Sequence, residues 1–282
     1  MLNPSVASSR IKKIVGESFT EGEDLLAAEQ PMEIRLGFGR AEERKQKRVS
    51  VTMRTPGNDF ELALGFLFTE GIIKNMSDVL EIKYCTDLNR FEDRENVVRI
   101  EIRDDVEFDA GRLQRNFYTS SSCGVCGKAS IDAIKTVLEP AASELTFNVQ
   151  RELILSLPPR LRMQQKVFEY TGGLHASALF DVEGNLIFIR EDVGRHNALD
   201  KLTGAALAKD LLPLDQHILL LSGRASFELI QKAAMAGIKI VAAVGAPSSL
   251  AVETAEEFHM TLIGFLRDNR FNIYSFPERI LI

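Results

Sequence analysis

Two cysteines, Cys123 and Cys126, lie within the segment 119–130, whose sequence is TSSSCGVCGKAS. Small residues surround both, so we expect the thiols to lie on an accessible loop. The sequence that follows predicts a helix, whose first turn would present unpaired N–H groups and a partial positive charge. Both features favour the thiolate, which is the form that attacks sulfur. The pair is therefore a candidate for thiol chemistry.

The CxxC spacing is shared by redox dithiols, by half-sites for metals and by persulfide carriers. Cys85 is the only other cysteine in the chain, so a four-thiolate zinc site cannot be completed. Zinc deaminases carry H-x-E followed downstream by P-C-x-x-C. In this chain the residue two positions after His175 is Ser177 and not glutamate. The CxxC motif also precedes the histidine in the chain, and the residue before it is Ser122 and not proline. We therefore expect no zinc and no other bound metal.

Thiol exchange of the thioredoxin kind stays open as a second interpretation. Thioredoxin motifs normally follow a strand inside a βαβ unit, whereas this motif follows the polar, irregular segment 101–122, which reads as a linker. A third interpretation is a non-enzymatic chaperone that only holds a cofactor. The residues alone do not rank Cys123 above Cys126.

Downstream of residue 216, apolar strands alternate with helices. The predicted strands are 218–221, 238–244 and 261–265, and the predicted helices are 227–235 and 250–258. Continuous apolar strands in this order indicate a mainly parallel sheet that is covered on both faces.

Small polar residues and arginines follow each of these strands. They are Ser222 and Arg224, then Ser248 and Ser249, then Arg267 and Arg270. In open α/β sheets ligands bind beyond the carboxyl ends of the strands, and guanidinium groups with exposed amides suit phosphates. Any single serine is better explained as a local helix cap or turn residue. For the three strand ends together we favour the binding of an anion.

Ionisable residues also gather in the segment 191–197, EDVGRHN, where a strand meets a helix. One interpretation is a ligand site. The other is structural, with Asp192 and Asn197 capping the helix and Arg195 paired with a carboxylate. His175 begins a predicted hairpin, 175–180 and 186–190, and we expect it to be structural.

The first half of the chain has a different pattern. Strands are predicted at 49–54 and 97–103, around a helix that begins near Asp59 and stops at Gly71. We therefore divide the chain into a small α+β domain, 1–115, and a larger α/β domain, 116–282, with the CxxC loop at its start. In the second domain, Pro158 and Pro159 are expected to end a helix.

Composition narrows the class of protein. At 282 residues the chain can form two domains, and three cysteines suit a reducing compartment. The net charge of −6 shows none of the excess of basic residues that is typical of proteins that bind nucleic acid. Neither a leader pattern nor a membrane-length apolar run stands out. We expect a soluble, cytoplasmic protein that binds neither nucleic acid nor membrane.

Several segments together resemble the formate dehydrogenase accessory sulfurtransferase family, FdhD. They are CGVCGKAS at 123–130, TGGLHASA at 171–178, REDVGRHNALDK at 190–201, SGRAS at 222–226, APSSLA at 246–251 and LGFLFTEGII at 64–73. The resemblance covers nearly the whole chain, and only the first ~30 residues contribute little.

The resemblance implies a sulfurtransferase. Such a protein takes persulfide sulfur from a cysteine desulfurase and delivers it to the molybdenum cofactor, bis-molybdopterin guanine dinucleotide, so that formate dehydrogenase becomes active. It also implies a cytidine-deaminase-like, three-layer C-terminal domain without zinc, beside the smaller α+β domain. A homodimer stays open, because the sequence does not fix the oligomeric state.

Carried over by position, Cys123 would bear the persulfide and Cys126 would assist transfer. The cofactor-binding segment would be Phe265, Leu266, Arg267, Asp268, Asn269 and Arg270. Many relatives have glycine or Pro-Gly inside this segment, where this chain has Asp268 and Asn269. Both tolerate a left-handed backbone, but Asp268 adds negative charge near a phosphate site. We therefore expect contact by Arg270 rather than by Asp268.

Overall fold

The computed structural model describes residues 5–85, 95–106, 108 and 147–282. Cys123, Cys126 and the helix predicted after them lie outside these residues. The predicted domain boundary at 115/116 also lies outside them and stays a prediction.

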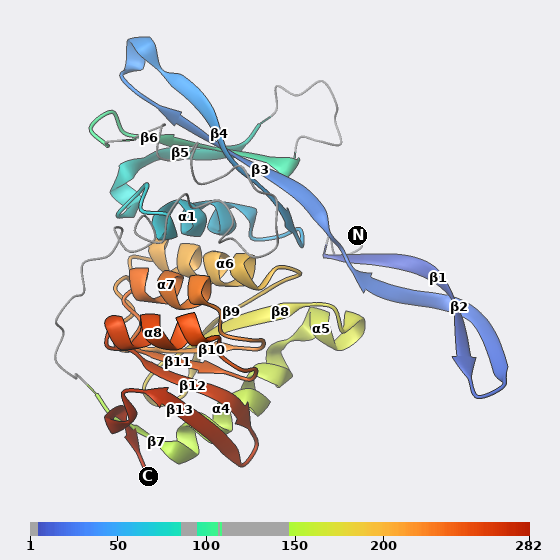
Figure 1. Ribbon diagram of the computed structural model, residues 1–282. Coiled ribbons are helices and arrows are strands. Elements are labelled where there is room, and N and C mark those ends of the chain that lie inside the picture. Colours follow the sequence, from blue (N-terminus) through green and yellow to red (C-terminus); the bar gives the residue numbers. More distant parts are fainter. Residues whose placement is uncertain (1–4, 86–94, 107, 109–146) are drawn as a thin grey trace.

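A six-stranded sheet forms the centre of the C-terminal half, with strand order β13-β12-β11-β10-β8-β9 (Figure 1). Its strands are β8 (His175–Phe180), β9 (Leu186–Asp192), β10 (Ile218–Leu221), β11 (Ile240–Ala243), β12 (Thr261–Arg267) and β13 (Arg270–Ser275). Only the pairs β10–β11 and β11–β12 are parallel. The prediction of a mainly parallel sheet is therefore wrong. Short turns make hairpins of β8–β9 and β12–β13, and a short turn can join only antiparallel strands.

Helices cover both faces of this sheet. On one face lie α6 (Arg195–Leu207), α7 (Phe227–Met235) and α8 (Ser249–Glu257), and on the other lies α4 (Arg151–Gln164), followed by α5 (Lys166–Thr171). Within β10, Leu219 and Leu221 pack under α6 to α8, while Ile218 and Leu220 pack against α4. Burial on both faces explains the unbroken apolar run of this strand. The predicted three-layer α/β arrangement is confirmed.

Helix α4 continues through its two prolines. Pro158 and Pro159 were expected to end it, yet it runs to Gln164. Leu157 and Leu161, on either side of the prolines, are buried against the sheet. Tertiary packing of this apolar face holds the helix together where its own backbone hydrogen bonds are lost.

Within the described residues, the N-terminal half contains a four-stranded sheet packed against helix α1. Sheet order is β4-β3-β6-β5, from β3 (Gln30–Phe38), β4 (Lys45–Arg54), β5 (Val79–Tyr84) and β6 (Val97–Ile102). Helix α1 (Asp59–Thr69) begins and ends as predicted, with Gly71 in a left-handed conformation after it. Short 3₁₀ turns occur at η1 (Ala41–Glu43) and η2 (Met76–Asp78). This is the α+β module that the sequence predicts.

Helices α1 and α6 join the two halves. They cross at Gly65 and Gly204, where a Cβ added to Gly65 would lie 1.8 Å from the carbonyl oxygen of Asp200. A Cβ on Gly204 would lie 1.9 Å from the carbonyl oxygen of Glu61. Only glycine allows this approach, so the two halves meet backbone to backbone.

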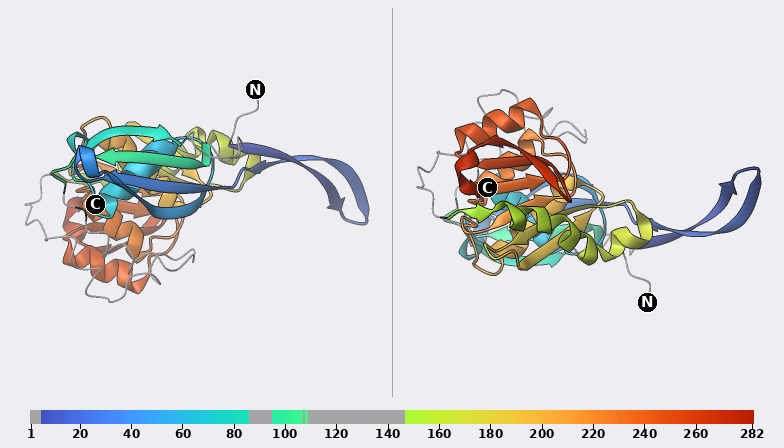
Figure 2. Two further views of the ribbon diagram at one scale, coloured as in Figure 1. Left: turned by 90° about the horizontal axis from the view of Figure 1, so that it is seen from above. Right: turned by 90° about the horizontal axis from the view of Figure 1, so that it is seen from below.

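The N-terminus forms a hairpin that the sequence did not predict. Strands β1 (Val6–Val15) and β2 (Ser18–Ala27) pair along their whole length and extend away from the body of the protein (Figures 1 and 2). At the opposite end of the chain, β14 (Ile280–Leu281) pairs with β7 (Val149–Gln150), and a 3₁₀ turn, η5 (Pro277–Arg279), precedes β14. Among the described residues, no helix is long and apolar enough to cross a membrane.

Candidate functional site

The loops that follow β10 and β11 and the irregular C-terminal part of β12 form one continuous rim. The Gly245 N–H donates to the carbonyl of Gly223 at 2.9 Å, and the Phe265 N–H donates to the carbonyl of Gly245 at 3.0 Å. A further bond of 3.0 Å joins the Ser248 N–H to the carbonyl of Ala225. The expectation that these three strand ends lie together is confirmed, and backbone hydrogen bonds hold them in register.

A cleft of about 690 Å³ opens beside this rim, on the α4 side of the sheet. Its apolar lining comes from Pro158, Pro159, Leu161, Phe168, Leu174 and Val244. Its polar lining comes from Arg162, Gln165, His175, Ser222 and Asp268. A mostly apolar cavity with a few polar groups at the carboxyl ends of strands is the usual form of a small-molecule site.

The predicted serines differ in their roles. Ser222 lines the cleft, and its Oγ accepts the Ala176 N–H at 2.8 Å, which leaves the hydroxyl proton for a ligand. Ser248 caps α8 by accepting the Ala251 N–H at 3.2 Å, so the local-cap interpretation is confirmed for this residue. Ser249 is exposed at the start of α8, and Arg224 is exposed in the loop after β10.

The segment 265–270 is a β-hairpin rather than a loop. Arg267 and Arg270 face each other across the turn formed by Asp268 and Asn269, and all four are exposed. Phe265, at a left-handed position, is 41 % exposed. Leu266 is fully buried against the α4 side of the sheet, so its side chain cannot reach a ligand in the cleft. Of this segment, Asp268 is the residue that lines the cleft, whereas the sequence favoured Arg270.

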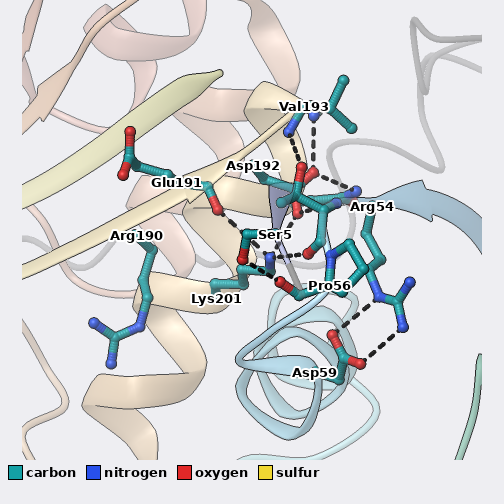
Figure 3. Close-up of polar contacts among 12 residues, drawn as sticks. Ser5, Arg54, Pro56, Asp59, Arg190, Glu191, Asp192, Val193 and Lys201 are labelled. Carbon is teal, nitrogen blue, oxygen red and sulfur yellow. Dashed lines mark hydrogen bonds and ion pairs between the residues drawn. The ribbon is translucent and has the colours of Figure 1, made fainter. Parts of the chain in front are cut away.

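Asp192 is structural, as one interpretation of the 191–197 segment proposed, but it does not cap α6, whose N-cap residue is Gly194. Its fully buried carboxylate accepts the N–H groups of Thr55 and Gly194, and it pairs with Lys201 Nζ at 2.7 Å (Figure 3). Lys201 also donates to the carbonyl of Thr55 at 2.7 Å. Because Thr55 belongs to the N-terminal half, this buried ion pair joins the two halves.

Asn197 and Arg195 differ from the structural interpretation. Asn197 lies inside α6 and is not its cap; its Nδ2 donates to the carbonyl of Met53 at 2.8 Å. Arg195 forms no ion pair with any described residue, and its Nε is buried without a hydrogen-bond partner. Among the described residues, this guanidinium therefore lacks a carboxylate partner at the first turn of α6, the end of a helix at which the helix dipole does not favour a cation.

Two histidines lie beside this arginine. Burial, followed by the charges of Arg195 and Lys232, lowers the pKa of His196 to about 3, and its Nε2 lies 3.3 Å from Ser226 Oγ. Burial and then the charge of Arg195 also lower the pKa of His175, which lines the cleft. Both imidazoles are therefore neutral at pH 7 and can exchange hydrogen bonds without adding charge.

Buried charges that the sequence analysis missed fix α1 against α6 and α7. Lys232 Nζ lies 2.9 Å from both carboxylate oxygens of Asp200 and from Thr69 Oγ1. Arg54 and Asp59 form a second buried pair at 2.9 Å (Figure 3). Each of these charged residues lies within or at the start of a predicted helix or strand. A charged residue at such a position was the only indication in the sequence that the charge is buried.

Cys85 is the only cysteine within the described residues. It is buried at the end of β5, and its Sγ lies 3.8 Å from Arg35 Nη1. The expectation that the chain binds no zinc stays a prediction, since both cysteines of the CxxC motif lie outside the described residues. The catalytic roles of Cys123 and Cys126 stay predictions for the same reason.

Comparison with known proteins gives a consistent result. The model of the FdhD/NarQ family matches residues 27–281. "Sulfur carrier protein FdhD" of Streptomyces coelicolor is 50 % identical over 261 residues, which cover 92 % of this chain and 90 % of that protein. The protein of the same name from Mycobacterium tuberculosis is 44 % identical over 282 residues, which cover 98 % and 99 %.

Among solved structures, a proposed formate dehydrogenase accessory protein from Desulfotalea psychrophila has a similar fold. The TM-score is 0.72, with 23 % sequence identity, and the match covers 99 % of this chain and 100 % of the other. At this identity the likeness supports the fold alone.

Proposed function

Because the chain belongs to the FdhD/NarQ family, we propose that it is a sulfur carrier that takes persulfide sulfur from a cysteine desulfurase and delivers it to the molybdenum cofactor of formate dehydrogenase. The observation that carries this proposal is the match to proteins named sulfur carrier, at 50 % identity over 92 % of the chain. The CxxC motif supplies the thiols that such a carrier requires. We place the reaction in the reducing cytoplasm, where these thiols stay available.

In the loading step, the Cys123 thiolate attacks the outer, sulfane sulfur of the desulfurase persulfide. The new bond is Cys123 Sγ–S, the bond between the two desulfurase sulfurs breaks, and the desulfurase cysteine leaves as a thiolate. The chain then carries one additional sulfur atom. No external oxidant or reductant takes part in this exchange.

In the delivery step, the Cys126 thiolate attacks Sγ of the Cys123 persulfide. A disulfide forms between the two cysteines, and the outer sulfur leaves as hydrosulfide beside its acceptor. A thiol reductant must then supply two electrons to restore both thiols. The molybdenum cofactor is thus a substrate of the reaction and not a resident group.

We assign the nucleotide end of that substrate to the cleft at the strand ends. Arg162 packs over the Phe168 ring, 4.6 Å from its centroid, and its guanidinium suits phosphate oxygens. Asp268 supplies a carboxylate that can accept the N–H groups of a guanine base, and the apolar walls suit a flat ring. Holding the nucleotide end would fix the position of the sulfur acceptor relative to the carrier.

The test is intact-mass spectrometry after incubation with a cysteine desulfurase and cysteine. The native chain is expected to gain one sulfur atom, which a reductant removes, and Cys123→Ala is expected to gain none. Cys126→Ala should load normally but release its sulfur slowly. Cys85→Ala is the matched control, because this buried cysteine has no part in the proposed reaction.

Two other outcomes would contradict the proposal. A loss of two hydrogens without any gain of sulfur would indicate a dithiol–disulfide oxidoreductase. Failure to load sulfur in every form, with unchanged cofactor binding when both Cys123 and Cys126 are alanine, would indicate a non-enzymatic chaperone.

A further inference from the structure

The four-stranded sheet of the N-terminal half uses only one of its faces to pack against a described helix. Helix α1 covers that face, toward which apolar residues such as Ile34 and Ile100 point. No other helix of the described residues lies on the opposite face, which the left view of Figure 2 shows from above. The alternate residues of the same strands therefore form an outer face that is open to a partner.

One row of this outer face consists of four cations. Arg48 on β4 lies directly opposite Arg35 on β3, and Arg35 lies opposite Arg99 on β6. Arg99 in turn lies opposite Lys83 on β5. The row crosses the whole sheet, whose neighbouring strands lie about 4.8 Å apart. Directly opposed like charges destabilise a sheet. The stability of the sheet therefore gives no reason for this row, whereas an anionic partner does.

Carboxylates lie beneath the arginines and do not balance them. Glu33 is shared by two of them, since its Oε1 lies 2.5 Å from Arg35 Nε and its Oε2 lies 3.0 Å from Arg48 Nε. The side chain of Glu33 is 15 % exposed, whereas that of Arg48 is 66 % exposed. At this end of the row, the guanidinium groups therefore form the outer layer of the face.

A second shared carboxylate lies on the other side of the row. Glu101, whose side chain is 11 % exposed, pairs with both Arg99 and Arg44. Arg99 Nε has no hydrogen-bond partner within the described part of the chain. At the end of the row, Lys83 pairs with Glu81 at 2.7 Å, and both are exposed. Two carboxylates that each serve two guanidinium groups leave the outer face with an excess of positive charge, although the whole chain has a net charge of −6.

Exposed apolar side chains continue the outer face beside the cationic row. Val51 lies opposite Glu33, and Met53 lies opposite Pro31. Both are exposed. Arginine and methionine are enriched in protein–protein interfaces. Nucleic acid binding depends on contacts to the phosphates, to which these apolar side chains add nothing. The combination therefore favours an acidic protein surface over nucleic acid.

We propose that the outer face binds an acidic surface of the protein that donates the sulfur, an inference that rests on the proposed function. The acceptor is assigned to the cleft on the α4 side of the central sheet, and α1 and the outer face lie beyond the opposite side of that sheet. The donor and the acceptor would then bind without competing. Strand β6, which carries Arg99, is also the last described strand before Cys123, so the donor would lie beside the strand that leads to the thiols.

The test measures sulfur loading from a cysteine desulfurase by intact mass, at several concentrations of the full-length chain. The charge-reversed form carries Arg48→Glu with Lys83→Glu, both exposed and both on edge strands. The chain concentration that gives half-maximal loading is expected to rise by about tenfold or more, while the maximal rate stays unchanged. Raising the salt concentration from about 50 to about 300 mM should slow loading of the native chain more than loading of the reversed form.

Arg151→Glu with Lys166→Glu is the matched control. It makes the same change in net charge on α4 and α5, away from the outer face, and should load as the native chain does. Cysteine persulfide, a small donor that needs no docking surface, should load every form equally, which would show that the reversed form is folded and that its thiols are intact. The milder form, Arg48→Ser with Lys83→Ser, should have an intermediate effect.

Three results would overturn the proposal. Equal loading of the native and reversed forms by the desulfurase would remove the outer face from donor binding and leave the sulfur-carrier proposal standing. No gain of sulfur by the native chain from either donor would contradict the proposed function itself, and this inference with it. Salt-sensitive binding of a DNA duplex by the native chain, lost in the reversed form, would assign the outer face to nucleic acid instead.

Discussion

The contact between α1 and α6 and the rim beside the cleft are both rich in charge, yet they differ in how that charge is arranged. At the helix contact, Lys232 and Lys201 are buried and each meets a carboxylate. At the rim, Arg224, Arg267 and Arg270 are exposed and form no ion pair within the described residues. Buried ion pairs hold the two halves of the chain together. Solvent-exposed charges without an ion-pair partner, beside a cavity, remain available to bind a ligand.

Replacing Gly65 with alanine tests the tighter of these two regions. Alanine normally stabilises a helix interior by about 1 kcal/mol over glycine. Here its Cβ would lie 1.8 Å from the Asp200 carbonyl oxygen, so the two helices must move apart. We expect a loss of about 3 kcal/mol or more in the free energy of unfolding, measured with urea. Gly22→Ala, with no atom within 4 Å of the added Cβ, is the control. Equal stability of the two variants would show that the crossing is looser than described.

Replacing Lys232 with methionine tests the buried charges of the helix contact. Burial alone would lower the pKa of Lys232, but the carboxylates of Asp200, Glu70 and Glu228 outweigh this effect and raise it. Without the ammonium, Asp200 is buried without a cation, and we expect unfolding to require about 3–5 kcal/mol less. Adding Asp200→Asn should recover part of this loss. Lys166→Met, at an exposed position, should change stability by less than about 0.5 kcal/mol. A Lys232→Met chain as stable as the native one would contradict the prediction.

The pH dependence of the free energy of unfolding tests whether the His196 imidazole, between the helix contact and the rim, is shielded from solvent. The pKa of His196 falls to about 3 in the folded chain, while an unfolded histidine titrates near 6.5. Below pH 6.5 the unfolded chain therefore binds a proton that the folded chain excludes, and stability declines as the pH falls toward 3. Between pH 7 and pH 5 this amounts to about 2 kcal/mol. Urea unfolding at both values should show that His196→Asn removes this part of the decline. An unchanged decline would mean that His196 is solvated.

Replacing Arg270 with glutamine tests the open rim and should have the smallest effect. Stability should stay within about 0.5 kcal/mol, because the side chain is exposed. Binding of guanosine 5′-monophosphate, the nucleotide end of the proposed substrate, should weaken by about threefold to tenfold in calorimetry. Arg103→Gln, an arginine in the N-terminal half, is the control. Equal affinity of both variants would remove Arg270 from the site.

Helices and strands could be predicted from the sequence where the local pattern of apolar residues alone defines them. The bounds of strand β10 and helix α7 were predicted to the residue. Each is a short apolar or amphipathic segment that begins and ends at a clear change to loop residues. Helix α4 was not, because its continuation through Pro158 and Pro159 depends on the sheet beneath it. The β8–β9 hairpin at one edge of the sheet was predicted, whereas the antiparallel pairs β8–β10 and β12–β13 were missed because local pattern does not show which strands lie side by side.

The candidate site was predictable in part. The loops after three strands were expected to meet, and they do, because adjacent parallel strands end at one edge. Which side chain lines the cleft could not be predicted, because it depends on where α4 lies relative to the β12–β13 turn: Asp268 lines the cleft while remaining exposed, and Leu266 packs into the core. The sequence pattern did not show that Leu266 lies within strand β12 while Asp268 lies in the turn that follows it.

The sequence by itself determined the α/β class, the resemblance to a sulfur-carrying family and the thiol pair, because these depend on residue type and local spacing. The tertiary structure alone decided that Asp192 and Lys201 join the two halves and that Gly65 and Gly204 bring two helices into backbone contact. It also showed that Arg195 stays without a carboxylate among the described residues. The physical reason is distance along the chain. Whether a charge is buried with a counter-charge or left for a ligand depends on segments more than a hundred residues apart, which only the fold brings together.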